Sequence, residues 1–113
     1  ASIVNGARGE LEITGYKGYV LYKIVTDADA WVRIYCDDAS RQADINRSEG
    51  NDPAPGSGVI AEARIDGTQL VTPGVMGFNN DDPRLETIYL SINNRSGSDQ
   101  AITVTLTLLK IGE

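Results

Sequence analysis

Alternation of apolar and polar residues is the feature that most restricts what this chain can fold into. In residues 101–111 three threonines alternate with Ile102, Val104, Leu106 and Leu108, and residues 87–93 repeat the pattern with Ile88, Leu90 and Ile92. Successive side chains of a β-strand point to opposite faces, so an alternating segment has one buried and one solvated face. The sequence therefore predicts strands that cover a shared core.

Two further segments have the same period but carry apolar residues on both faces. In residues 19–26, Val20, Tyr22 and Ile24 would share one face, and the other face, from Tyr19 to Val25, is also largely apolar. That composition predicts a strand in the interior of a sheet. In residues 31–36, we expect Val32, Ile34 and Cys36 to face the core and Trp31, Arg33 and Tyr35 to face away.

Weaker strand patterns and turn signals complete the expected fold. Short strands are expected at 10–14, 59–66, 69–72 and 75–78, with a hairpin turn at 66–67, a proline turn at 72–74 and a hairpin loop at 93–100. Eight short strands with turns between them predict one all-β domain over residues 1–113, an antiparallel β-sandwich of jelly-roll or immunoglobulin-like type. At most one short helix is expected, at 37–44, capped by Asp37 or Asp38.

A long polar segment, residues 37–58, separates the strand that ends at Cys36 from the apolar residues that resume at Val59. We call this segment the excursion. Loops of this length without structure of their own are often functional. Its arginines, Arg41 and Arg47, can pair with carboxylates inside the excursion or on another subunit. Pro53 and Pro55 restrict its backbone, which would limit the entropy lost on docking. These four residues are the candidate interface residues, and a plain connection between sheets is the alternative.

The side-chain inventory argues against catalysis. The chain has no histidine and one cysteine, so it lacks the usual neutral-pH general base, a Cys–His or Ser–His–Asp triad and an intrachain disulfide. Its aspartate pairs lie in turn-like segments, where they are expected to cap the backbone. A net charge of −6 without a basic cluster argues against nucleic-acid binding, and no apolar run is long enough to cross a membrane. We expect no enzymatic activity and no cofactor.

Two binding sites nevertheless merit a test. Asn79, Asp81 and Asp82 lie in a run of oxygen ligands suited to Ca²⁺, although a simple turn explains the same residues. Arg33 between two aromatic side chains on one strand can bind a sugar, or can instead lie over Trp31 at the edge of the sandwich. A carbohydrate- or calcium-binding β-sandwich module, with a surface glycan as ligand, is therefore the alternative function.

Four segments that together cover most of the chain resemble small virion structural proteins of tailed bacteriophages, especially phages of cyanobacteria and other aquatic bacteria. They are ITGYKGYVLYKI (13–24), AWVRIYCDDASRQADINRSEGNDPAPGSGVIAE (30–62), VTPGVMGFNN (71–80) and AITVTLTLL (101–109). The resemblance implies a particle component: a capsid decoration, a neck or tail accessory, or a fibre module. It also implies other virion proteins and further copies of the chain as partners, with a location in the virion after assembly in the host cytoplasm. It carries over no functional residues.

Overall fold

The protein is a two-layered β-sandwich with one short helix on its outside. The computed structural model describes residues 2–49, 51, 53 and 56–111. One sheet contains, in spatial order, β2 (Arg8–Thr14), β7 (Thr87–Asn94), β4 (Ala30–Tyr35) and β5 (Val59–Ile65). The other contains β6 (Thr68–Phe78), β3 (Gly18–Thr26) and β9 (Val104–Lys110), and a separate pair joins β1 (Ser2–Ile3) to β8 (Gln100–Ala101). The all-β prediction is confirmed.

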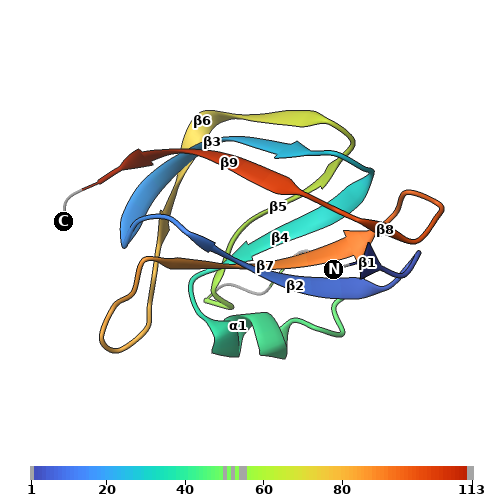
Figure 1. Cartoon of the computed structure of the whole chain (residues 1–113). Helices are drawn as coiled ribbons and strands as arrows, with labels where there is room; N and C mark the ends of the chain where they lie inside the picture. Colours follow the sequence, from blue (N-terminus) through green and yellow to red (C-terminus); the bar gives the residue numbers. More distant parts are fainter. Residues whose placement is uncertain (1, 50, 52, 54–55, 112–113) are drawn as a thin grey trace.

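The core lies between the two sheets. Figure 1 shows the three-stranded sheet stacked over the four-stranded sheet, with helix α1 (Asp38–Ala43) on the outer side of the latter. The completely buried apolar side chains come from both layers: Leu21, Ile24, Val32, Ile34, Ile88, Leu90 and Ile92. These include the core residues expected for β4 and β7, so the alternation in those strands predicted the buried face correctly.

The strand order identifies the sandwich as a jelly roll. All ladders are antiparallel, and β4 pairs with β5, β3 with β6, and β2 with β7. β1 pairs with β8, which continues after two residues into β9. These pairs are those of one long hairpin that is folded back between β4 and β5 and rolled into two layers, which distinguishes a jelly roll from an immunoglobulin-like sandwich. The excursion after Cys36 lies at the fold-back point of this hairpin.

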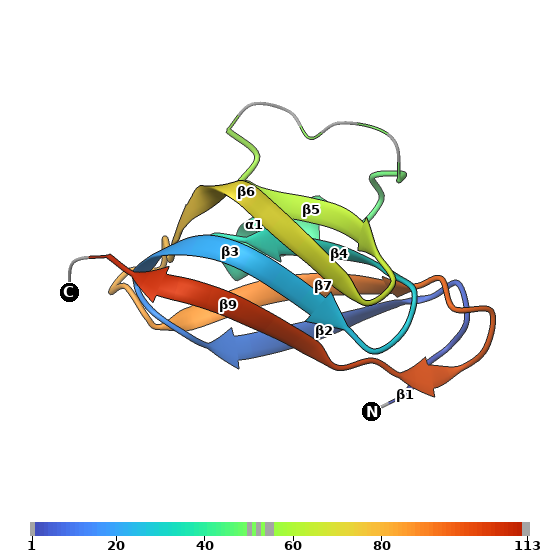
Figure 2. The ribbon, with the colours of Figure 1, turned by 90° about the horizontal axis from the view of Figure 1, so that it is seen from above.

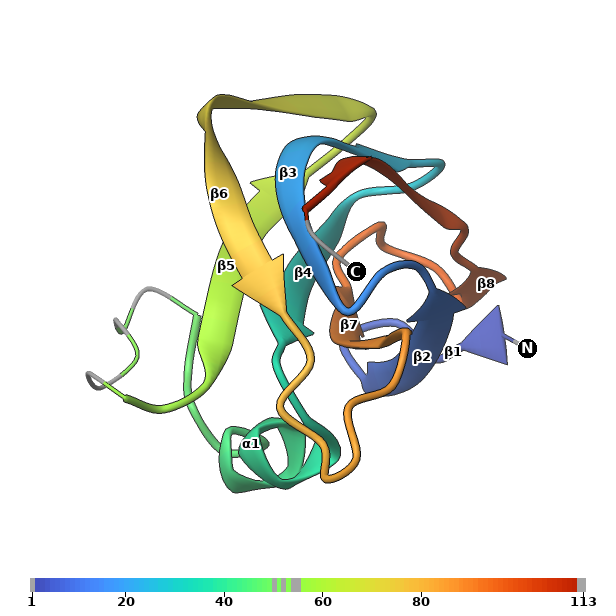
Figure 3. The same ribbon diagram turned by 90° about the vertical axis from the view of Figure 1, so that its left-hand side faces the viewer.

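Two predicted hairpins are wrong, because both turns pass from one sheet to the other. β5 and β6 are consecutive through Asp66 and Gly67, but they belong to different sheets. The N–H of Thr26 donates to the carbonyl of Gly67 over 2.7 Å, which ties this turn to the end of β3. Figure 3 shows β5 rising from one layer into β6 in the other. The loop at 93–100 likewise joins β7 to β8 rather than to a ladder neighbour.

The predicted turn at 72–74 is also wrong, since β6 runs without a break through Pro73. Its register with β3 jumps between Val75 and Leu70, so residues 71–74 oppose Tyr22 alone in a bulge. β6 pairs on one side only, and an edge strand tolerates a proline because its missing N–H removes no ladder bond.

The same bulge changes the face assignment of β3. Tyr19 and Leu21 are buried, as is Ile24, whereas Tyr22 is exposed. The extra residue between Leu21 and Lys23 shifts the alternation by one position, so Tyr22 and Ile24 do not share a face as predicted. The position of this strand in the middle of its sheet is as predicted.

Candidate functional site

Helix α1 is fixed to the four-stranded sheet by Arg41. The Asp37 carboxylate accepts a hydrogen bond from the Ser40 N–H over 2.8 Å and caps the helix, as the sequence predicts. The Arg41 guanidinium is buried and lies 2.6 Å from Asp38 of the same helix and 2.8 Å from Glu12 of β2. Its Nη1 also donates to the carbonyl of Leu90 on β7 over 3.3 Å. Arg41 therefore joins the helix to two neighbouring strands.

Asp44, directly after α1, organises a second buried network. Its carboxylate accepts from the Tyr35 hydroxyl, from Arg33 over 3.2 Å and from Arg47 over 2.7 Å. Burial raises the pKa of Asp44, but hydrogen bonds from Arg47 and Tyr35 and the two arginine charges together hold that pKa below its ordinary value. Arg47 also forms a salt bridge of 3.0 Å with Glu62 on β5. The network attaches the start of the excursion to the outer face of β4 and β5.

The interface role predicted for Arg41 and Arg47 stays a prediction, and the structure shows what each side chain contacts within its own chain. Both side chains are held by carboxylates of their own chain, so neither presents a free guanidinium to a partner. Glu49 similarly forms ion pairs with Arg64 and with Arg95. Of the two prolines, Pro53 is half-buried and Pro55 lies outside the described residues. The salt bridges inside the excursion that the sequence offered as the alternative do form, and each arginine additionally pairs with a carboxylate on a strand of the sheet.

The face formed by Trp31, Arg33 and Tyr35 is covered and offers no open sugar platform. Arg33 is completely inaccessible, and its guanidinium stacks 4.0 Å from the centre of the Trp31 ring. Arg47 lies on the same ring at 5.4 Å, while the Trp31 indole N–H donates to Glu62. The packing alternative is therefore correct, although the cover is the excursion rather than the edge of the sandwich.

The oxygens of the candidate calcium loop are engaged by the protein itself. The Asn79 side chain is buried, and its Oδ1 accepts from the N–H groups of Asp81 and Leu85 over 2.8 and 3.0 Å. The Asp81 carboxylate accepts from the Asn79 amide and from the Tyr89 hydroxyl, both over 2.9 Å. Asp82 is exposed. Within the described ranges no three acidic or sulfur side chains converge as metal ligands would. The arrangement is that of a hydrogen-bonded turn.

A different surface, which the sequence did not reveal, lies on the outside of the three-stranded sheet. Among the described residues, nine large apolar side chains are exposed, and six of them come from β6, from β3 and from β9 with the residue after it: Tyr22, Leu70, Met76, Phe78, Leu109 and Ile111. We call these six residues the outer β3 face. Met76 is 70 % exposed and Leu109 is 54 % exposed, and both are ladder partners of Val20. Figure 2 looks down on this side of the sheet.

The register explains how these side chains gather. Ladder partners point to the same side of a sheet, so Met76, Val20 and Leu109 form one row across three strands. The bulge at Tyr22 adds a further aromatic ring to that side. The sequence contained one signal for this surface, since both faces of residues 19–26 are apolar, but a central strand covered on both sides has the same pattern.

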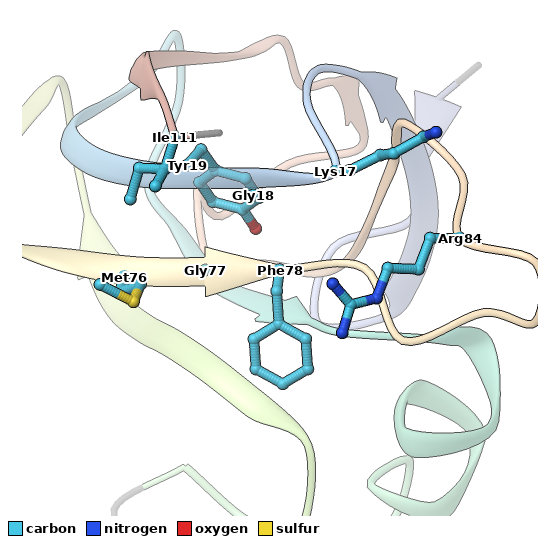
Figure 4. A pocket seen from close by; sticks show the side chains of 8 residues that line it. All are labelled: Lys17, Gly18, Tyr19, Met76, Gly77, Phe78, Arg84 and Ile111. Atoms are coloured by element: carbon cyan, nitrogen blue, oxygen red, sulfur yellow. The ribbon is translucent and has the colours of Figure 1, made fainter. Parts of the chain in front are cut away.

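The outer β3 face ends in a shallow hollow of about 390 Å³ at the beginning of β3. Met76, Phe78 and Ile111 line it together with the cationic Lys17 and Arg84. Figure 4 shows the Arg84 side chain extending toward the ring of Phe78. The surface thus combines exposed apolar side chains with two cationic side chains at one end.

Comparison with known proteins provides no identification: no protein-family model matches the chain, and no curated protein sequence is significantly similar to it. In the described part of the chain no helix is long and apolar enough to cross a membrane.

Proposed function

We propose that this protein is a non-enzymatic structural component of a tailed-phage particle that acts through protein–protein contacts. The observation that carries the proposal is the outer β3 face, because a patch of six exposed large apolar side chains on one sheet of a small domain is typical of an interaction surface. The jelly roll supports it, since viral capsid domains use this architecture. The sequence resemblance to virion proteins points to the same role.

The buried polar residues support an assembly role in a second way. The charged side chains buried deepest are Arg33, Arg41 and Asp44, and each is used to attach the excursion to the sheet. An acid or base that works on a substrate has to reach it in an accessible cleft. The Cys36 thiol is likewise buried beside Ser40, and burial raises its pKa, which makes it a poor nucleophile.

Particle association tests the proposal directly. The tagged protein is produced in cells infected with a phage that encodes it, the particles are purified on a density gradient, and the protein is quantified against the major capsid protein by mass spectrometry. We expect a fixed ratio. A Met76→Glu, Leu109→Glu double variant should be lost from the particles, whereas Val4→Glu, which adds a charge at an exposed apolar residue elsewhere, should be retained.

A protein that is abundant in the infected-cell extract but missing from purified particles would contradict the proposal. A glycan array provides the contrasting measurement: specific sugar binding without particle association would instead favour the carbohydrate-binding alternative.

A further inference from the structure

One strand position of the jelly roll is filled over only two residues. The two sheets of this fold share eight strands, and the sheet that contains β2, β7, β4 and β5 has its four. The fourth position of the other sheet lies beyond β9, and β1 enters it only where it pairs with the two residues of β8. Figures 2 and 3 show β1 on the side of β8 that faces away from β3. Along β9 itself, no strand of the described chain takes this position.

The backbone of β9 shows which groups face the open position. The Ile111 N–H donates to a carbonyl of β3 over 3.0 Å, and the Thr103 carbonyl accepts from the N–H of the residue after β3 over 3.3 Å. Consecutive residues of a strand direct their N–H and C=O groups to opposite sides. The extra residue of the bulge belongs to β3, so the alternation along β9 is unbroken. The even-numbered residues, from Val104 to Lys110, therefore direct their backbone groups to the free edge.

The strand that lies opposite the open position is β2. A β-carbon added at Gly15 would lie 2.5 Å from the Ile88 side chain and 3.2 Å from that of Leu108, so β7 and β9 face each other across the core. β2 is the next strand after β7, and Figure 2 shows it emerging from beneath β9. Its core-facing residues Leu11 and Ile13 are only half-buried, because this part of the core has one layer.

An apolar hollow of about 310 Å³ lies between the two layers at this place. Ile13 and Tyr16 line it from one layer, and Leu106 and Leu108 line it from the other. Directly opposed residues of paired strands point to the same side of the sheet. A strand added beside β9 would therefore direct the side chains opposite Leu106 and Leu108 into the hollow, so those side chains have to be apolar.

The other three edges of the sandwich carry features that discourage pairing, and the edge of β9 does not. Charged side chains, proline and bulges all protect sheet edges from added strands. β2 carries three charged residues, β5 carries two, and β6 contains Pro73 and the region opposite the bulge. β9 has seven residues, and its single charge, Lys110, is the last of them.

From these observations we propose that the free edge of β9 binds an extended segment of another polypeptide chain, which runs antiparallel to β9 and continues the line of β1. Such added strands are held by a row of backbone hydrogen bonds, and alternate side chains in pockets give specificity. The segment has apolar residues at alternate positions and no proline, because proline lacks the N–H that the ladder needs. This site is separate from the outer β3 face, so the inference goes beyond the particle role proposed above.

A second copy cannot supply the strand from its own β9. Two-fold pairing of β9 with β9 would place β2 of the second copy opposite this β9, and β7 already occupies that place. A single extended segment meets no such obstacle. The occupant is therefore a free arm of a partner rather than the edge of another sandwich.

Hydrogen exchange of the purified full chain, followed by NMR, tests the edge itself. The amides of Leu106 and Leu108 should exchange at least about tenfold faster than those of Thr105 and Thr107, which bond to β3. The rates should not depend on the concentration of the chain.

A synthetic peptide then tests the occupant. The probe is the acetylated, amidated heptapeptide Glu-Thr-Val-Thr-Val-Thr-Val, whose valines fall opposite Leu108, Leu106 and Val104 in an antiparallel ladder and whose glutamate falls opposite Lys110. At about 1 mM, a concentration suited to weak binding, it should slow exchange at Leu106 and Leu108 at least about tenfold. Exchange at Thr105 and Thr107 should not change.

N-methylated peptides provide matched controls. The valine amides of the probe face β9, so methylation of all three should weaken binding at least about tenfold. The three threonine amides face away, and their methylation should change binding by less than about threefold. Shifting the alternation by one residue, in Glu-Val-Thr-Val-Thr-Val-Thr, turns the valines away from the hollow and should also weaken binding.

Any of four results overturns the inference. They are equal exchange rates at the even and odd amides of the free chain, no slowing by the peptide, equal binding of the two methylated peptides, and slowing that rises with chain concentration alone. The last result would identify a second copy as the occupant. Because these measurements use the purified chain and a synthetic peptide, their outcome is independent of incorporation into particles.

Discussion

At the scale of single residues, Gly77 has the least room for a side chain in the contact between β3 and β6. A β-carbon at Gly77 would lie 2.3 Å from the Tyr19 ring, which is itself buried. At Gly18 the nearest atom to an added β-carbon is 3.4 Å away, an ordinary contact. The requirement for glycine at position 77 is therefore steric, and no pattern in the sequence indicates it.

Alanine substitutions at Gly77 and Gly18 distinguish the cost of steric crowding from the general effect of replacing glycine by alanine in a strand. Gly77→Ala should lower the free energy of unfolding by about 1–3 kcal/mol, because the ring must move within a packed core. Gly18→Ala should change it by less than about 0.5 kcal/mol. Urea denaturation of both variants measures the difference, and equal effects would show that the ring moves without a penalty.

Substitutions of Arg41 and Arg84 form a second matched comparison. Arg41→Ala removes a buried guanidinium together with its hydrogen bonds to Asp38, to Glu12 and to the Leu90 carbonyl, so it should lower the free energy of unfolding by about 1–3 kcal/mol. Arg84→Ala removes an exposed cation and should change it by less than about 0.5 kcal/mol. Thermal melting of both variants measures the difference. A near-zero effect at Arg41 would mean that the helix is held by other contacts.

At the scale of elements, the strands were largely predictable and their connections were not. Alternation located the core residues of β4 and β7, and the cap at Asp37 located α1. The turn at 66–67 was misassigned because Asp-Gly favours a tight turn whether or not the flanking strands remain paired. The bulge opposite Tyr22 depends on the register between β3 and β6, so a single strand read by itself cannot reveal it. The outer β3 face was missed for the same reason.

Because β9 is an edge strand, the alternation of apolar and polar residues in it predicts which side chains face the core but not how deeply they are buried. Val104 is buried, but Leu106 and Leu108 are only half-buried, although all three face the core as predicted. Within the part of the chain that the structure describes, no strand pairs with the free edge of β9. The predicted inward row is confirmed, and its burial is less complete than in the central strands.

Leu106 and its neighbour Thr105 test this difference between the faces. Leu106→Ala should lower the free energy of unfolding by about 2 kcal/mol, the low end for buried leucine, because the side chain is half-exposed. Thr105 is exposed on the other face, and Thr105→Ala should change it by less than about 0.5 kcal/mol. Chemical denaturation gives both values. A larger loss at Thr105 would reverse the face assignment of β9.

At the scale of the whole molecule, stability should fall in acid. The pKa values of Asp44, Asp38, Glu10 and Glu49 are all lowered by arginine or other hydrogen-bond partners that outweigh burial. A carboxyl whose pKa is lower in the folded than in the unfolded state stabilises the fold above the unfolded value, about 4, and loses that contribution as the pH falls through the folded value.

We therefore expect the urea midpoint to be constant from pH 7 to about pH 5 and to decline below about pH 4. Asp44→Asn should lower the midpoint at pH 7 and make the decline shallower, while Asp66→Asn, at an exposed residue without a side-chain partner among those described, should follow the wild-type curve. A midpoint independent of pH would show that these ion pairs do not stabilise the fold.

The nested pairing of the jelly roll also has a consequence for how the protein is made. On a ribosome the chain emerges at roughly 5–20 residues per second, and β4 meets its neighbour β5 first. β3 can pair only after β6 has been synthesised, and β2 only after β7. The second edge of β3 remains unpaired until β9 has been synthesised. Each later pair closes a longer loop, and folds dominated by such distant contacts form slowly. The nascent protein therefore spends seconds with unpaired strand edges, a period in which chaperones would matter most.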